Sequence, residues 1–143
     1  PLGMKSMVPE FDASGTLIGG SLIHGSARDW ARFGEFLRNR GAVQGAQLVP
    51  SAWIDFMTTP SPISPNYGGQ LWLNRAPKGG DVQWPGAPTS TFSMNGHLGQ
   101  YVIISRDNGV TVVRLGKTQD NLRRPVHEAL AKIITLFPKG STT

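Results

Sequence analysis

The segment of this sequence best suited to chemistry is glycine-rich: Gly96-His97-Leu98-Gly99-Gln100. Small residues leave backbone N–H groups free to face a cleft, as an oxyanion hole requires, where one donor contributes roughly 2.7–4 kcal/mol of transition-state stabilisation. The structural alternative is that Gly96 and Gly99 only relieve crowding at the start of a strand. On the residues alone, the structural alternative is favoured.

Other familiar chemistry is missing from the sequence. His24, His97 and His127 stand far apart, without the HxxxH or HxH spacing of a metal site. The glycine-rich segments lack the Lys-Ser/Thr ending of a phosphate-binding loop, and no serine lies in a Gly-x-Ser-x-Gly or Ser-x-x-Lys motif. We therefore expect no metal and no cofactor, and the chain contains no self-evident nucleophile.

The composition fits one soluble globular domain. The chain has 143 residues, of which 38% are hydrophobic and 16% charged. The net charge of +5 is scattered and does not interleave with aromatic residues, which argues against a nucleic-acid partner. No apolar run is long enough to span a membrane. The absence of cysteine excludes disulfides and thiolate chemistry but leaves the periplasm and the cytoplasm equally open.

Two helices are predicted in the first half of the chain, after a loop-rich stretch over residues 1–25. Ser26 and Asp29 are spaced as a capping box at the start of a helix, and Gly41 stands where a left-handed cap would end it. Trp30, Phe33 and Leu37 supply its apolar stripe. A second, shorter helix is expected within residues 50–59.

The second half of the chain is predicted to form a sheet and a final helix. We expect a strand over residues 67–74 and a hairpin pairing 101–105 with 110–115, turning at Asn108-Gly109. Both hairpin strands are nearly continuously apolar, so the sheet should be covered on more than one side. The last helix should lie on it through one face, formed by Val126, Leu130, Ile133, Ile134 and Phe137. The prediction is an α+β chain with an antiparallel sheet.

Four segments in order resemble the serine hydrolases of the β-lactamase fold, and above all the class C-like β-lactamases, esterases, amidases and 6-aminohexanoate-dimer hydrolases. They are "PLGM", "ARDWARFGEFLRNRG" followed by "LVPSAWI", "YGGQLWL", and "GHLGQYVIISRDNGVTVVRLG". The resemblance implies hydrolysis of a small ester, amide or lactam through an acyl-enzyme. It also implies that residues 1–143 form the C-terminal part of a single domain, whose Ser-x-x-Lys and Tyr-x-Asn motifs lie on a missing N-terminal portion.

In that family a strand bearing Lys-Thr-Gly or His-Thr-Gly edges the active site, and two registers are possible here. In one, His97-Leu98-Gly99 takes this role and the Gln100 N–H points into the oxyanion hole. In the other, Met94-Asn95-Gly96 takes it and the His97 N–H is the donor. The distance from Gly99 to Arg106 matches the family's second glycine, which favours the second register.

The resemblance implies further site residues and one departure. His97 and Gly96 would form the oxyanion-hole strand, and substrate would contact Asn95, Met94, Gly99, Gln100 and Tyr67. Met94 stands where the family has Lys or His, which argues against an efficient β-lactamase and favours an esterase or amidase with a less charged substrate. The aromatic residues Trp30, Phe33, Trp53 and Trp72 are expected in the core.

Two functions of different classes follow. One is a serine hydrolase to which this chain supplies the oxyanion strand without the nucleophile. The other is a non-catalytic ligand-binding or scaffold module of the same fold, since no Ser-x-x-Lys is present. Alone, the chain would expose an apolar sheet edge, so we expect it to be unstable, to form a homodimer or to pair with the missing portion.

Overall fold

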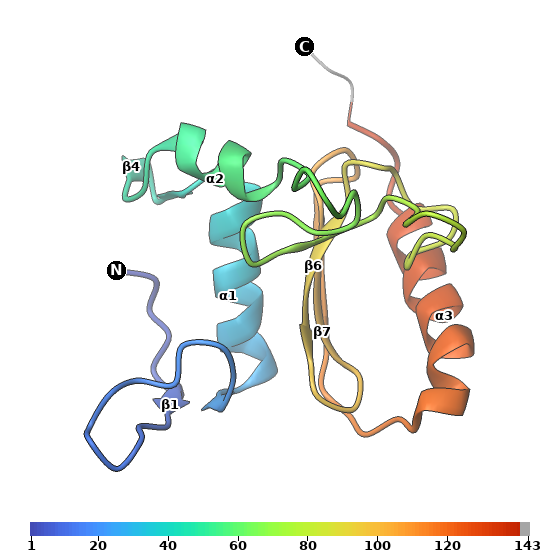
Figure 1. Ribbon diagram of the computed structural model, residues 1–143. Helices are drawn as coiled ribbons and strands as arrows, with labels where there is room; N and C mark the ends of the chain where they lie inside the picture. The colour runs from blue at the N-terminus through green and yellow to red at the C-terminus, as the bar shows by residue number, and fades with distance from the viewer. Residues whose placement is uncertain (141–143) are drawn as a thin grey trace.

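The computed structural model describes residues 1–140, which form three α-helices and eight short strands (Figure 1). The elements follow the order β1 (Val8–Pro9), β2 (Ile23–His24), α1 (Ala27–Arg38), β3 (Ala42–Val43), β4 (Ala46–Gln47), α2 (Ser51–Met57), β5 (Trp72–Leu73), β6 (Phe92–Gly96), β7 (Gln100–Ser105), β8 (Val110–Arg114), a 3₁₀ turn (Asp120–Leu122) and α3 (Arg123–Thr135). The prediction of an α+β fold is confirmed.

One four-stranded antiparallel sheet, in the order β5-β6-β7-β8, organises the molecule. Phe92 pairs with Ile104 and Gly96 with Gln100, so the glycine-rich segment forms the turn of the β6–β7 hairpin. The predicted hairpin at Asn108-Gly109 is also present, as β7 and β8. Gly109 takes the positive φ that this turn requires, 61°.

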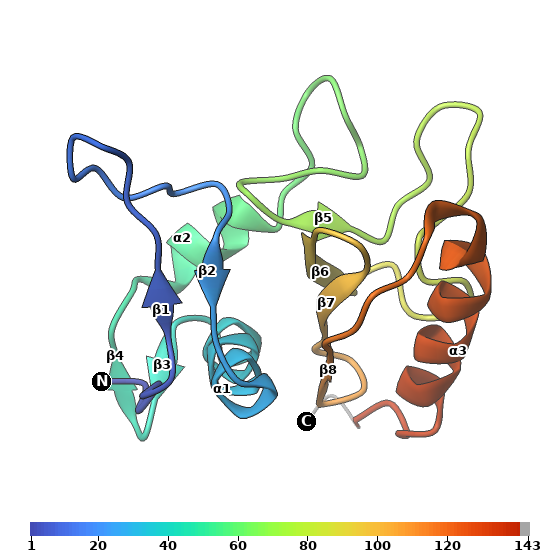
Figure 2. The ribbon, with the colours of Figure 1, turned by 90° about the horizontal axis from the view of Figure 1, so that it is seen from below.

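Helices cover both faces of the sheet, as its apolar strands predicted (Figures 1 and 2). The α1 face buries Phe36, Leu37, Ile54, Leu71, Leu73, Phe92, Val102 and Ile104. The α3 face buries Trp84, Tyr101, Ile103, Leu130, Ala131 and Ile134. Because successive residues of a strand point to opposite faces, β7 divides its side chains between these two clusters.

Helix α1 begins and ends at the predicted signals. Ser26 Oγ accepts from the Asp29 N–H, and Gly41 has a φ of 84° after the last turn. The reciprocal half of the capping box is absent, because the Asp29 carboxylate instead accepts from the backbone N–H and hydroxyl of Ser6 and pairs with Arg32. Asp29 therefore ties the N-terminal segment to α1.

Three other predictions needed correction. Only Trp72–Leu73 of the expected strand 67–74 pairs with β6, because the chain turns back so that Tyr67 bridges to Trp72. On α3, Ile133 is 40% exposed, and Phe137 lies beyond the helix end, so Val126, Leu130 and Ile134 face the sheet. Trp53 and Trp72 are exposed, unlike Trp30 and Phe33, which pack against the α1-face core.

Within the described part of the chain, no helix is both long and apolar enough to cross a membrane. Over the same residues, no three His, Asp or Glu side chains gather into a group suited to a metal ion.

Candidate functional site

The backbone of β6 is unpaired on one side at the end where the candidate site residues lie. The Asn74 N–H donates to the Thr91 carbonyl at 2.9 Å, so the backbone groups of Thr91 face β5. In an antiparallel ladder this direction alternates with every residue, so Ser93 and Asn95 face the same edge. β5 pairs no further than Ser93, which leaves the Asn95 backbone without a strand beside it among residues 1–140.

The same alternation bears on the two registers of the glycine-rich motif. Phe92, Met94 and Gly96 direct their backbone groups at β7, where Gly96 is paired with Gln100. The Gln100 N–H is thus turned toward β6, whereas His97 is the first residue of the turn that follows β6. In the register that uses the Gln100 N–H, the donor would therefore be a group that lies within the β6–β7 pairing.

The turn that carries His97 is tightly specified by its backbone. Leu98 and Gly99 have φ angles of 57° and 88°, a left-handed pair that closes the hairpin. A Cβ on Gly96 would lie 2.8 Å from the Gln100 Cβ, and a Cβ on Gly99 would lie 3.0 Å from Arg114 Nη1. Both glycines are therefore needed to avoid crowding in the hairpin, which is the structural alternative considered for this segment.

The last residue of β8 and the residues that follow it hold this turn through hydrogen bonds. Thr118 N–H donates to the Leu98 carbonyl at 2.8 Å, and Arg114 donates to the Gly99 carbonyl and, at 2.6 Å, to Thr118 Oγ1. The Gln100 side chain bonds to the backbone of Gly116. The side chain of Gln100, a predicted substrate contact, is thus engaged within the protein.

Met94 and Asn95 point to opposite faces of the sheet. Met94 packs against the α1-face core, whereas Asn95 lies exposed on the α3 face. Asn95 Oδ1 accepts from Ser93 Oγ at 2.9 Å, and its Nδ2 donates to Gln83 Oε1 at 3.0 Å. Ser93 Oγ in turn accepts from Trp84 Nε1 at 3.2 Å. The Asn95 amide is thereby fixed in one orientation.

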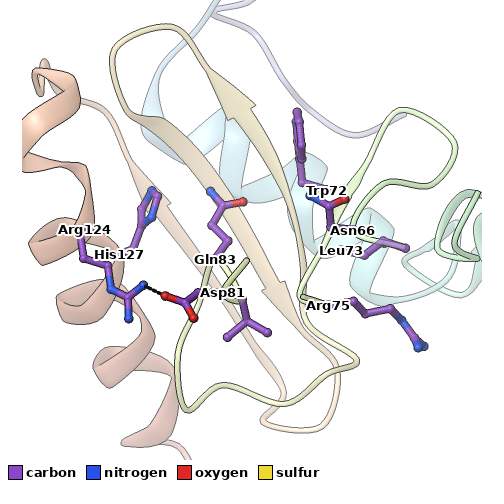
Figure 3. A pocket seen from close by; sticks show the side chains of 9 residues that line it. Asn66, Trp72, Leu73, Arg75, Asp81, Gln83, Arg124 and His127 are labelled. Atoms are coloured by element: carbon purple, nitrogen blue, oxygen red, sulfur yellow. Dashed lines mark hydrogen bonds and ion pairs between the residues drawn. The ribbon is translucent and has the colours of Figure 1, made fainter. Parts of the chain in front are cut away.

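A hollow of about 240 Å³ opens on the α3 face beside this network (Figure 3). Its lining comes from the segment around β5, the β5–β6 loop (residues 74–91) and α3: Asn66, Trp72, Leu73, Arg75, Asp81, Val82, Gln83, Arg124 and His127. Tyr67 stands against Trp72, with ring centroids 4.9 Å apart, so this predicted site residue borders the hollow through Trp72.

A cluster of aromatic rings packs around His127, one of the residues that line the hollow. Tyr101 Oη and His127 Nε2 lie 2.8 Å apart, and both rings meet Trp84 edge to face. Burial, and then the neighbouring Arg123 and Arg124, lower the pKa of His127, which favours the neutral form of its imidazole. Burial raises the pKa of Tyr101.

The structure brings most of the predicted site residues to one end of the sheet. Residues 94–100 all lie on β6, its turn and the first residue of β7. Sequence reasoning missed Gln83 and the Trp84–Ser93 contact, which join the β5–β6 loop to β6. The Gln83-Trp84 pair within a Pro/Gly-rich loop could have predicted that this loop packs on the sheet, since a tryptophan is usually buried against a core.

Comparison with known proteins shows similarity at the level of structure only. No protein-family model matches the sequence, and no curated protein matches it. A Bacillus anthracis protein described as a 6-aminohexanoate-dimer hydrolase superposes with a TM-score of 0.70 at 19% identity, over 96% of this chain and 37% of that one. A Bacteroides dorei protein described as a β-lactamase superposes with a TM-score of 0.61 at 17% identity, over 94% of this chain and 48% of that one.

These superpositions span nearly all of this chain but less than half of either solved structure. They agree with the resemblance drawn from the four sequence segments. The chain therefore has the architecture of part of a β-lactamase-like hydrolase fold.

Proposed function

We propose that this chain is the part of a β-lactamase-like serine hydrolase that supplies the oxyanion-hole strand, with the nucleophile on a preceding portion of the same protein. The substrate is a small ester or amide, cleaved through an acyl-enzyme. The His97 N–H is one of two donors to the carbonyl oxygen that becomes negatively charged, and the acylated serine's own N–H is the other.

The unpaired edge of β6 is the observation that carries this proposal. A substrate carbonyl can approach the backbone there without displacing a strand among the described residues. The hydrogen bonds behind the turn keep the donor in place before substrate arrives, so little reorganisation is needed as charge develops.

Met94 bears on the class of substrate. It buries an apolar side chain against the α1-face core at the position where the resembling family carries Lys or His. Without that cation, a substrate carboxylate loses its counter-charge. This favours neutral esters and amides over penicillins and cephalosporins, which carry a carboxylate.

The test is hydrolysis by the full-length gene product, assayed on p-nitrophenyl acetate and on a chromogenic cephalosporin. We expect ester hydrolysis that is lost when the serine of an upstream Ser-x-x-Lys is changed to alanine, and a much lower rate on the cephalosporin. A well-folded full-length protein that hydrolyses neither compound would contradict the proposal and leave a non-catalytic binding or scaffold module.

A further inference from the structure

We propose that the hollow on the α3 face is a subsite for an uncharged carbonyl group in the acyl part of the substrate, and that Gln83 donates the hydrogen bond that recognises it. This inference rests on the proposed function for the identity of the substrate. The existence of a carbonyl-binding site at Gln83 can be tested separately.

The direction of the hydrogen bonds around Asn95 is fixed from one end. The Trp84 indole N–H can only donate, so Ser93 Oγ must accept from it. Ser93 then has its one hydroxyl proton for Asn95 Oδ1. The Asn95 amide consequently presents Nδ2 to its next neighbour, Gln83, which accepts through Oε1.

In this series of hydrogen bonds the oxygen of the Gln83 amide is occupied by Asn95, so its NH₂ group is available to donate to a ligand. Within residues 1–140, Gln83 Nε2 has no acceptor at hydrogen-bonding distance, and turning the amide round would set two NH₂ groups against each other. Figure 3 shows Gln83 lying between Trp72 and His127, in the middle of the lining. The protein thus directs a fixed donor at the hollow, and a donor selects an acceptor oxygen.

The charges around the hollow favour an uncharged acceptor over a carboxylate. Arg124 is already engaged by Asp81 at 2.9 Å and by Glu128 at 2.8 Å. Arg75 extends away from Gln83 in Figure 3. Next to Gln83 the hollow therefore offers a neutral dipole beside an ion pair that is already compensated, while the Arg75 cation lies on the part of the lining that extends away from Gln83.

The hollow also has the size and position for a short side group. About 240 Å³ holds a few non-hydrogen atoms, and Trp72, 39% exposed, gives the group an apolar wall. Gln83 is bonded to Asn95, the residue of β6 immediately before Gly96 and His97. An acyl chain attached to a carbonyl held at His97 would reach the hollow by running past Asn95.

The experiment compares three p-nitrophenyl esters of equal acyl length in the full-length protein: pentanoate, N-acetylglycinate and the monoester of glutarate. We expect kcat/KM to favour the N-acetylglycinate, and Gln83→Glu to reduce that preference about tenfold, since it keeps the acceptor for Asn95 and removes the donor. Gln44→Glu is the matched control, because Gln44 is exposed on the distant β3–β4 turn and the charge change is identical.

Each outcome decides between alternatives. Preference for the glutarate monoester would overturn the choice of an uncharged group, and an unchanged preference in Gln83→Glu would overturn the role of Gln83. Should no ester be hydrolysed, the proposed function fails, and titration of the protein with N-methylacetamide decides the subsite alone. The side-chain NH₂ resonances of Gln83, identified by their loss in Gln83→Glu, should shift saturably; no shift would overturn the subsite.

Discussion

The side chain of Gln100 and the backbone of Gly116 form a closed pair of hydrogen bonds. Gln100 Nε2 donates to the Gly116 carbonyl at 2.8 Å, and the Gly116 N–H donates to Gln100 Oε1 at 2.9 Å. A side-chain amide here imitates a paired strand, continuing the ladder beyond the end of β8. It anchors the chain that supports the turn carrying His97.

Replacing Gln100 by leucine should loosen this support. The N–H of the half-buried Gly116 loses its partner and its carbonyl keeps only Arg114 Nη1, at 3.3 Å, so we expect the free energy of unfolding to fall by about 1–2 kcal/mol. Urea denaturation measures the change. Gln119→Leu is the control, since Gln119 is exposed and makes no side-chain cap. Equal stability of the two variants would show that the paired amide contributes nothing.

Two substitutions separate the contribution of the His97 backbone N–H to activity from that of its imidazole side chain. In the full-length protein, His97→Ala keeps the N–H, so esterase activity should change little. His97→Pro removes the N–H and should lower kcat by about 10²–10³. A large loss in His97→Ala instead would favour the other register, in which the imidazole takes part. Circular dichroism on both variants checks that the hairpin remains folded.

Gly34 lets α1 approach the sheet closely. A Cβ at this position would lie 2.5 Å from Thr111 Cγ2 and 2.9 Å from Val102 Cγ1. Gly34→Ala gains up to about 1 kcal/mol of helix propensity, but overpacking costs about 1–3 kcal/mol, so we expect net destabilisation. Thr111→Ser removes the nearer methyl and keeps the hydroxyl bonded to Glu35, so the alanine should be better tolerated in that background. Greater stability of Gly34→Ala in the native background would contradict this packing.

The lowered pKa of His127 predicts a loss of stability in mild acid. Burial and the charges of Arg123 and Arg124 disfavour its protonation in the folded chain, whereas in the unfolded chain it protonates near its ordinary value of 6.5. Below that pH the unfolded state binds more protons, so stability falls as the pH decreases. Between pH 7.5 and 5.5, the native chain should lose more stability than His127→Gln in chemical denaturation. Parallel losses would contradict the prediction.

Sequence patterns predicted the helices, the β7–β8 hairpin and the coverage of both sheet faces, because each depends on local spacing. The extent of the strand expected over residues 67–74 depended on a chain reversal between Tyr67 and Trp72, which alternation of apolar residues does not reveal. The exposure of Trp53 was equally hidden, since an aromatic residue in a short helix fits a core or a surface by pattern alone.

The candidate site was predictable in part for the same reason. The glycine-rich segment indicated backbone N–H groups free to face a cleft, but not that it is a hairpin turn. Gln83 is 12 residues from Asn95 in sequence and meets it only through tertiary folding. Hydrogen bonds between a loop and a strand have no repeating sequence pattern. The network that orients Asn95 could therefore be identified only from the structure.

The outer edge of β8 remains unpaired in the described part of the chain. Alternation across the sheet turns the backbone groups of Val112 toward β7 and those of Thr111 and Val113 toward the free edge. Such an edge is a template for another strand, and exposed apolar side chains such as Leu115 lie beside it. Two copies can satisfy each other's edges by pairing β8 with β8.

The isolated 143-residue chain should therefore dimerise or aggregate in dilute solution, as measured by sedimentation equilibrium. Val113→Pro removes an N–H that faces the free edge and should shift the chain toward monomer while its circular dichroism is kept. Val112→Pro removes a donor to β7 instead, so it should unfold the sheet. A stable, well-folded monomer of the native chain would contradict the prediction, because the unpaired edge would then carry no tendency to associate.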